Sequence, residues 1–335
     1  MIKRRSFLAS TVAAAAAAAL PRLSLGAGLA PFKLFDTHAH FYTNQPDKYP
    51  FNAKGARYGA EKMIAKATAK PMTPQTVFAF WDKVGIERGT GVQYNSTYGT
   101  DNSYLLDVSK QHPDRITPVV ILSPTDAKTP ATLQAFAKDS HLTGVRFTGA
   151  QNPEGEFAYL SDASRDTWAA ADELGIAIVL MPLGPQIPLA LKKIAEFADR
   201  YPNVKIVMDH IGFPRPEHLP GTLGLTPEHA ALASHKNVYY KYTSFLISEM
   251  EVGAKAAGKP MVELKPFLHH MVGVFGADHL VWGSDYGNVE VDDVEYVKRA
   301  LASADGLKQK QKEAIFYDTA KSVFVAGGRG KSMPG

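Results

Sequence analysis

The chain has 335 residues, of which 45% are hydrophobic and 21% charged, a composition typical of a globular protein with enough apolar material for a large core. Its formal charge is +4, but the first thirty residues hold four basic residues and no acidic one: Lys3, Arg4, Arg5 and Arg22. Without these four, 33 basic residues face 33 acidic ones, so charge gives no argument for nucleic-acid binding. Because the chain contains no cysteine, disulfides, thiolate metal sites and cysteine nucleophiles are excluded.

Residues 1–30 have the pattern of an export signal. Residues 4–8, Arg-Arg-Ser-Phe-Leu, resemble a twin-arginine signal, and seven alanines at 13–19 precede a small-residue stretch at 26–30. The apolar segment is shorter than the ~20 residues that span a bilayer, which favours cleavage over a membrane anchor. We therefore expect a periplasmic protein whose signal meets the export machinery, with no membrane span after cleavage.

Short apolar runs rich in β-branched residues alternate with helical patterns along the rest of the chain. The expected strands cover residues 33–37, 89–93, 116–121, 144–148, 176–181, 204–209, 238–242 and 279–283. The expected helices cover residues 74–84, 104–111, 131–138, 164–174, 188–201, 227–234, 260–275 and 292–302. Thr73-Pro74 and Thr226-Pro227 each place a capping hydroxyl before a first-turn proline.

Eight strands that alternate with helices predict an α/β fold, namely a single-domain (β/α)8 TIM barrel over residues 31–326. An open doubly wound sheet is the alternative, but no glycine-rich phosphate-binding pattern follows the first strand. Residues 41–72 are expected to form an inserted loop over the barrel mouth, and residues 327–335 a flexible tail.

A barrel places functional side chains at the carboxyl ends of its strands. The first strand ends in Asp36-Thr37-His38-Ala39-His40, and residues two apart on a strand point to the same side. Polar residues also end the fourth, sixth and eighth strands, at Arg146, His210 and Asp285. The barrel hypothesis therefore brings three imidazoles, a guanidinium and a carboxylate to one mouth.

These strand ends resemble the amidohydrolase superfamily, specifically the amidohydrolase-related branch that holds sugar lactonases, pyrone-dicarboxylate lactonase and certain decarboxylases. The resemblance rests on the first-strand motif, on Gly144-Val145-Arg146-Phe147 and on four further segments at residues 98–105, 208–214, 238–241 and 282–285. It implies a TIM barrel with a small-molecule substrate, and it is strongest toward the lactonases.

The resemblance also implies roles for individual residues. His38 and His40 match a pair that binds a divalent metal in many members and the substrate carbonyl in others. His210 matches an electrophile or second metal ligand, and Asp285 matches the aspartate that takes a proton from the attacking water. Arg146 matches a substrate-binding arginine, although pairing with Asp209 as interior scaffolding is the alternative; Tyr98 and Tyr286 are further candidates for substrate binding.

The chain departs from the family pattern at two strands. The expected fifth strand has no histidine ligand, and the fourth has Arg146 and Phe147 where binuclear members need a bridging lysine or glutamate. This leaves two alternatives: a mononuclear zinc or manganese site formed by His38, His40 and Asp285, or a site that acts without metal.

Three functions follow as hypotheses. The first is a hydrolase that opens a lactone or related cyclic ester of a small acid, such as a carbohydrate-derived one, by water attack. The second is metal-dependent non-oxidative decarboxylation of an aromatic or unsaturated acid, for which the fifth-strand ligand is absent. The third is a ligand-binding barrel without catalysis, which the joint presence of His38, His40, His210 and Asp285 disfavours.

Overall fold

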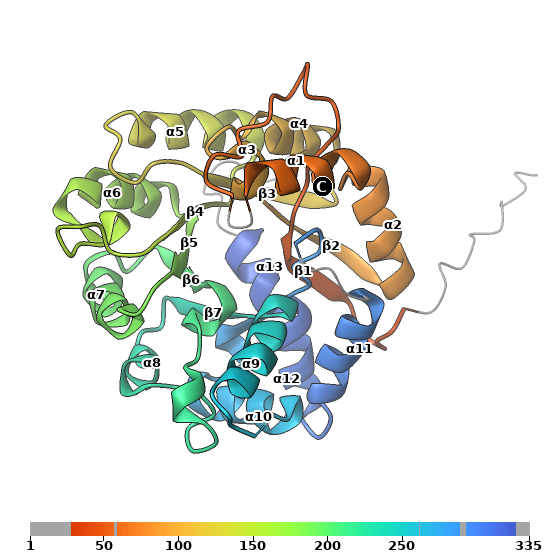
Figure 1. Cartoon of the computed structure of the whole chain (residues 1–335), viewed down its shortest axis with the longest axis vertical. Coiled ribbons are helices and arrows are strands. Elements are labelled where there is room, and N and C mark those ends of the chain that lie inside the picture. Colours follow the sequence, from red (N-terminus) through yellow and green to blue (C-terminus); the bar gives the residue numbers. More distant parts are fainter. Residues whose placement is uncertain (1–27, 57–58, 261, 289–292, 326–335) are drawn as a thin grey trace, which may run out of the picture.

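The computed structural model describes residues 28–56, 59–260, 262–288 and 293–325. Eight parallel strands form one sheet in the order β1 to β8, and helices surround it (Figure 1). The arrangement confirms the predicted (β/α)8 barrel. The strands are β1 Leu34–Ala39, β2 Ile86–Val92, β3 Ile116–Ile121, β4 Gly144–Gly149, β5 Ala177–Pro182, β6 Lys205–Met208, β7 Val238–Thr243 and β8 Leu280–Gly283.

Seven helices that follow the strands lie close to their predicted bounds, and so does α2 before the second strand. They are α2 Pro74–Val84, α4 Ser103–Gln111, α5 Thr129–Ser140, α6 Arg165–Leu174, α7 Ile187–Arg200, α8 Pro227–Leu232, α10 Leu264–Phe275 and α11 Asp293–Ser303. The structure adds elements that were not predicted: α1 Ala60–Ala69, α3 Asn95–Tyr98, α9 Ser244–Ala256, α12 Gln309–Glu313, a π-helical turn Ala314–Asp318 and α13 Thr319–Phe324.

Both predicted proline starts have the expected caps. Thr73 Oγ1 accepts a hydrogen bond from Thr76 N, directly before Pro74. Thr226 Oγ1 likewise accepts from His229 N, and His229 Nδ1 accepts a hydrogen bond from Thr226 N. These caps satisfy backbone N–H groups that have no partner inside the helix, which is why the helices begin there.

The barrel interior is apolar toward the amino ends of the strands, and α13, the last helix of the described residues, covers that end. Inward-facing side chains of six strands pack against one another and against α13, which lies at the centre of the ring in Figure 1. This layer consists of Phe35, Val92, Val119, Ala177, Val179, Val207, Val281, Tyr317, Ala320, Val323 and Phe324. Because the amino end is filled, only the carboxyl end can admit a ligand.

The barrel closes where β1 meets β8. A parallel bridge joins Ala39 to Tyr286, and His40 N donates to Tyr286 O at 2.9 Å. Gly283 allows this approach, since a Cβ there would lie 2.8 Å from His38 Cβ. Closure therefore brings the end of the first strand against residues that follow the last one.

Asp36 clamps this junction with a fully buried carboxylate. Its Oδ1 accepts from Ser284 N at 2.8 Å and His38 N at 3.0 Å, and its Oδ2 accepts from Ser284 Oγ at 2.5 Å. Trp81 Nε1 of α2 donates the fourth bond at 3.0 Å. Burial raises the pKa of Asp36, although the bonds from Ser284, His38 and Trp81 oppose that shift.

Asp36 does not point into the barrel mouth with His38 and His40. The pairing of β1 with β2 has a register irregularity between Asp36 and Ala39, which interrupts the alternation of faces. Asp36 consequently lies against Trp81 on the helix side, whereas the rings of His38 and His40 lie 5.0 Å apart. The first-strand motif thus combines one structural residue with two residues of the mouth.

The segment 41–72, which was predicted as an inserted loop, contains the helix α1. This helix lies across the front of the barrel in Figure 1, and Lys66 Nζ donates to Asn288 O at 3.1 Å. Helix α9 lies across the same end, after β7. The predicted signal, residues 1–30, falls almost wholly outside the described residues, and the predicted tail, residues 327–335, falls wholly outside them.

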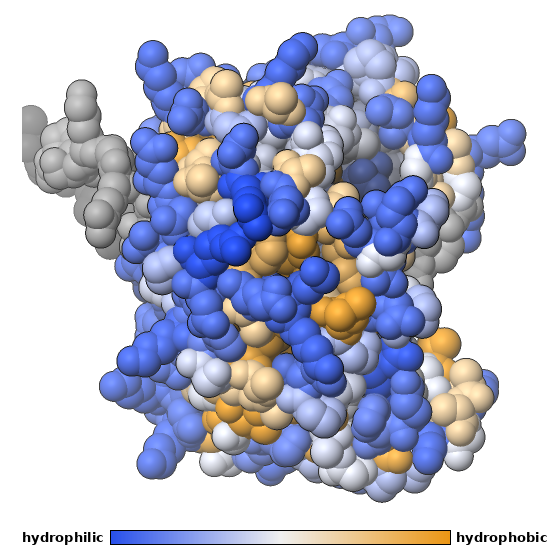
Figure 2. Space-filling view, turned by 90° about the vertical axis from the view of Figure 1, so that its left-hand side faces the viewer, coloured by the Kyte–Doolittle hydropathy of each residue, from blue (hydrophilic) through white to orange (hydrophobic). Residues whose placement is uncertain are grey.

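The outer surface is predominantly hydrophilic on the side that Figure 2 shows, with apolar side chains gathered in smaller patches between charged ones. Within the described residues, no helix has the length and apolar character that crossing a membrane requires.

We expect Asp36→Ala to destabilise the fold by about 2–4 kcal/mol, because four donors at the junction lose their acceptor. Thermal and chemical denaturation measure the change. The exposed Asp139 offers a matched control, and Asp139→Ala should change stability by no more than about 0.5 kcal/mol. Equal stability of the two variants would contradict the assigned role of Asp36.

Candidate active site

Five of the predicted site residues line a single cleft at the barrel mouth: His38, His40, Arg146, His210 and Asp285. All five are nearly or fully buried, with at most 5% of any of them exposed. They come from β1 and the residue after it, from β4, from the turn after β6 and from the segment after β8. The barrel thus gathers groups that lie up to 247 positions apart in sequence.

His40 and Asp285 face each other in a way that calls for a cation. His40 Nδ1 lies 2.9 Å from Val92 O, and because a carbonyl only accepts, Nδ1 carries the proton and Nε2 a lone pair. That Nε2 lies 3.3 Å from Asp285 Oδ1, which is also an acceptor. Two acceptors at this distance repel each other unless a proton or a metal ion lies near both.

His38 completes a three-ligand group. Its Nε2 lies 3.5 Å from Asp285 Oδ1, and one ligand atom from each of His38, His40 and Asp285 lies within 4.8 Å of the others. Within the described part of the chain, His38 Nε2 and Asp285 Oδ1 are buried without a hydrogen-bond partner. Two imidazoles and a carboxylate suit zinc or manganese, and the bond from His40 to Val92 O is the outer support that ligating histidines usually have. The residues therefore fit a mononuclear metal.

Asp285 is held in place by a chain of hydrogen-bonded side chains from the segments after β8 and β2. Asn288 Nδ2 donates to Asp285 Oδ2 at 3.0 Å, and Tyr94 Oη donates to Asn288 Oδ1 at 3.1 Å. The Tyr94 ring lies 4.5 Å from the His40 ring. With Oδ2 engaged, Oδ1 is the oxygen that faces His38 and His40.

His210 occupies a strained turn. Its φ is 53° and that of Ile211 is 55°, a left-handed conformation that costs about 1–2 kcal/mol per non-glycine residue. Its Nδ1 lies 2.6 Å from Thr243 Oγ1, while His229 Nε2 lies 3.1 Å from Gly212 O and supports the turn. Strain of this kind is held by surrounding contacts and concentrates at functional sites.

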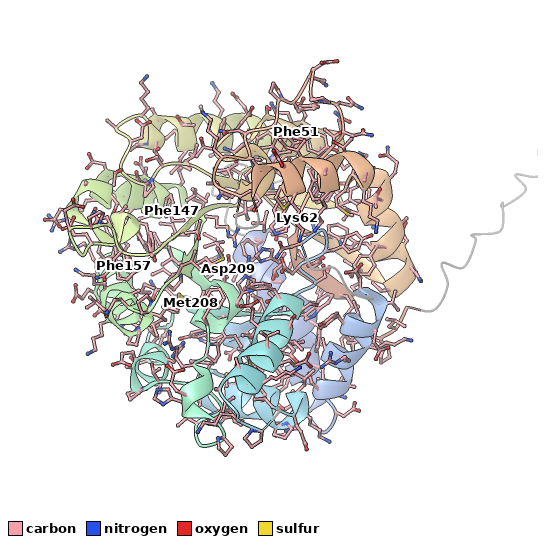
Figure 3. The ribbon with its side chains drawn as sticks, viewed as in Figure 1. Phe51, Lys62, Phe147, Phe157, Met208 and Asp209 are labelled. Atoms are coloured by element: carbon pink, nitrogen blue, oxygen red, sulfur yellow. The ribbon has the colours of Figure 1, made fainter. Side chains whose placement is uncertain are left out.

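Asp209 lies between two cations under the floor of the cleft. Figure 3 shows Asp209 near the centre of the ring, directly after β6. Arg146 Nε donates to its Oδ2 at 2.7 Å, and Lys241 Nζ lies 3.1 Å from its Oδ1. His38 Nδ1 is 3.4 Å from the same Oδ1. Arg146 thus pairs with Asp209, which was one of its two interpretations from the sequence, and it also lines the cleft.

The electrostatic environment keeps His38 and His210 neutral and Asp285 ionised. Burial and the Lys241 charge lower the pKa of His38 to about 3, and burial lowers that of His210 to about 4. Burial alone would raise the pKa of Asp285, but its contacts with His40 and His38 outweigh burial and hold the pKa below the usual value. Burial would also raise the pKa of Asp209, but Lys241 and Arg146 hold it well below that value.

Tyr98 and Tyr286, which were predicted as candidates for substrate binding, lie outside the cleft lining. Tyr98 is buried beneath the inserted segment, where its hydroxyl accepts from Thr43 N at 3.0 Å. Tyr286 stacks on Phe80 of α2 at 4.2 Å. Neither is among the described residues that line the cleft, because their rings pack into the shell between strands and helices.

Three residues of the site were not predicted from the sequence: Lys241, Thr243 and Asn288. The ammonium of Lys241 lies 3.5 Å from His38 Nδ1. A signal was present, since a lysine in the apolar run Val-Tyr-Tyr-Lys-Tyr-Thr has to be buried with a partner. Asn288 follows Asp285 by three residues, and nothing in its local pattern distinguishes it from an ordinary turn residue.

We predict that the purified protein binds about one equivalent of zinc or manganese and that His40→Ala abolishes stoichiometric binding. Elemental analysis after dialysis measures the metal, independently of any activity. The exposed His141 provides the control, and His141→Asn should retain the metal. Metal-free protein after incubation with either ion would contradict this prediction.

We expect Lys241→Met to destabilise the protein by about 2–4 kcal/mol, because Asp209 loses one of its two buried counter-ions. Denaturant titration measures the loss. Lys236→Met alters an exposed lysine in the same β6–β7 region and should leave stability within about 0.5 kcal/mol. A stability loss no greater than that of Lys236→Met would show that Lys241 does not neutralise Asp209.

The fold agrees with that of known proteins. The chain is 28% identical over 267 residues to an L-fucono-1,5-lactonase of Burkholderia ambifaria, covering 75% of this chain and 79% of that protein. A Pseudomonas putida structure assigned as a 2-pyrone-4,6-dicarboxylic acid hydrolase has a TM-score of 0.65 at 24% identity, covering 87% of this chain and 97% of that one.

Two further solved structures contain metal. A zinc-bound amidohydrolase of Burkholderia multivorans has a TM-score of 0.67 at 17% identity, over 88% of this chain and 99% of that one. A manganese-bound dihydroxybenzoic acid decarboxylase of Polaromonas sp. JS666 has a TM-score of 0.59 at 15% identity, over 87% of this chain and 96% of that one. At these identities the structures establish the fold alone. A family model described as Amidohydrolase matches residues 35–325, and the chain accordingly belongs to the amidohydrolase family of hydrolases.

Proposed function

We propose that this protein hydrolyses a small lactone or related cyclic ester. The observation that carries the proposal is the position of Asp285, a buried carboxylate held against His38 and His40 in one cleft with His210 and Arg146. The similarity to an L-fucono-1,5-lactonase supports ester opening as the reaction. Ester hydrolysis needs a polarised carbonyl, a base for water and a proton donor for the departing oxygen, and the cleft contains a candidate for each.

Asp285 is the candidate base. Its Oδ1 faces the cleft beside the two first-strand histidines, while the bond from Asn288 fixes Oδ2. In the proposed reaction Oδ1 accepts a proton from the attacking water and returns it to the alkoxide that leaves when the ring opens. Ring opening leaves the alkoxide and the new carboxylic acid group in one product molecule, so the alkoxide stays near Asp285. The same Asp285 carboxyl can therefore serve both proton transfers.

His210 is the candidate carbonyl-polarising group. The Thr243 hydroxyl accepts from Leu246 N and can donate its proton to His210 Nδ1, which makes Nε2 a donor toward the cleft. The lowered pKa of His210, about 4, keeps this ring neutral. A neutral N–H already in position stabilises a developing oxyanion without having to reorganise. Arg146 is placed to bind a further oxygen of the substrate.

A divalent metal bound by His38, His40 and Asp285 would supply Lewis-acid polarisation of the ester carbonyl. The chain's own residues define where it would sit, since Val92 O orients His40 and Asp209 lies beside Nδ1 of His38.

Decarboxylation is the second candidate, supported by the shared fold of a decarboxylase. The sequence of strand β5 disfavours decarboxylation, because Ala177–Pro182 contains no histidine to complete the metal site of such enzymes. Release of carbon dioxide from aromatic or unsaturated acids would identify it. A barrel without catalysis would bind lactones without opening them.

We expect Asp285→Asn to reduce kcat for lactone opening by at least about 100-fold, because the amide cannot accept a proton from water. A pH-indicator assay of acid release measures the rate, and circular dichroism checks the fold. Asp305→Asn changes an exposed aspartate and should retain full activity. Turnover by Asp285→Asn within a few-fold of the unmodified protein would refute the role of Asp285.

A further inference from the structure

The cleft is markedly unequal on its two sides. On the side of β1, β2 and β8, His40, Tyr94, Asn95 and Asn288 present polar atoms. On the side of β5 to β7, apolar side chains predominate; they come from the end of β5, from the loops after β5 and β6 and from helices α7 and α9. They form an apolar wall that consists of Met181, Leu183, Ile187, Phe213, Phe245 and Met250. The charged side chains on this side are Glu249 of α9 and the paired Arg215 and Glu217.

The apolar wall begins at the catalytic groups themselves. The Phe245 ring lies 4.7 Å from the His210 ring and the Phe213 ring lies 5.2 Å from it. Met181 Sδ lies 3.0 Å from Arg146 Nη2. A substrate whose carbonyl lies at His210 therefore places its neighbouring atoms directly against these side chains.

The cleft has room for more than a ring. Its volume is about 840 Å³, in the upper part of the range of about 300–1,000 Å³ that holds drug-sized ligands. Arg215 and Glu217, which also line the mouth, pair with each other at 2.8 Å. A hydroxylated substituent directed along the apolar wall would give up hydrogen bonds to water without replacement there, whereas an alkyl or aryl group would gain from burial.

We propose that the apolar wall is a substrate subsite and that the substrate is a lactone with an alkyl or aryl substituent, in place of a ring that carries only hydroxyl groups. This inference rests on the proposed lactone hydrolysis. It assigns the wall to the substituent and the polar side to the ring oxygens.

A series of δ-lactones tests the subsite: the unsubstituted ring, its propyl and pentyl derivatives substituted beside the ring oxygen, and a fully hydroxylated hexono-1,5-lactone. We expect kcat/KM to rise about two- to four-fold for each added methylene, the upper value corresponding to about 0.8 kcal/mol per buried CH2. The hexonolactone should be the poorest substrate. A flat series, or one led by the hexonolactone, would overturn the subsite.

Matched leucine variants locate the effect. Leu183→Asn places an amide in the apolar wall, and we expect the ratio of kcat/KM for the pentyl over the unsubstituted lactone to fall at least about five-fold. Leu189→Asn makes the same change on the outer surface of α7, where the side chain is 38% exposed, and should leave that ratio unchanged. Equal ratios in the two variants would overturn the assignment.

Binding of alkylcyclohexanones separates the subsite from the reaction, since these ketones keep the ring carbonyl but have no ester bond. Calorimetric affinity that rises with chain length, without hydrolysis of any lactone, would support the subsite and refute the proposed function. Lactone turnover at a rate independent of chain length would support the proposed function and refute the subsite. If the protein neither hydrolyses lactones nor binds the ketones with an affinity that depends on chain length, both the subsite and the proposed function are refuted.

Discussion

Closure of the barrel between its first and last strands is the constraint on which the site depends. The buried carboxylate of Asp36 accepts bonds from Ser284 and from the backbone of His38, so one side chain holds both edges of the junction. The neighbours of this clamp are the site: His38 lies two residues after Asp36, and Asp285 directly follows Ser284. Stability of the fold and geometry of the cleft thus share the same contacts.

Below the cleft, charge is balanced by residues that take no part in the proposed chemistry directly. Asp209 is buried between Arg146 and Lys241, and a buried carboxylate without such partners would be strongly destabilising. The same Asp209 lies beside Nδ1 of His38, opposite the nitrogen that faces Asp285. The ion pairs with Arg146 and Lys241 offset the free-energy cost of burying Asp209, and Asp209 in turn orients His38. Arg146 also lines the cleft, where it can contact the substrate.

The two sides of the cleft have different chemistry because different strands supply them. Polar groups follow β1, β2 and β8, where the junction and the Tyr94–Asn288–Asp285 chain need hydrogen bonds. Most of the apolar side chains of the cleft follow β5 to β7, on the same side as His210, and α9 lies over the mouth there and contributes Phe245 and Met250. In a barrel the loops vary while the strands stay constant, so reaction type and substrate choice reside in separate parts of the chain.

Local pattern alone was sufficient to predict the eight strands, most of the helices, and the gathering of His38, His40, His210 and Asp285 at one mouth. These follow from periodicity and from the rule that parallel strands end together. Tertiary structure decided what depends on contacts between distant segments. The register irregularity turned Asp36 away from the mouth, burial made Lys241 a partner of Asp209, and packing removed Tyr98 and Tyr286 from the cleft. A sequence specifies which side chains a strand offers, but the neighbours that pair with them, and so their charge and direction, exist only once the barrel has closed.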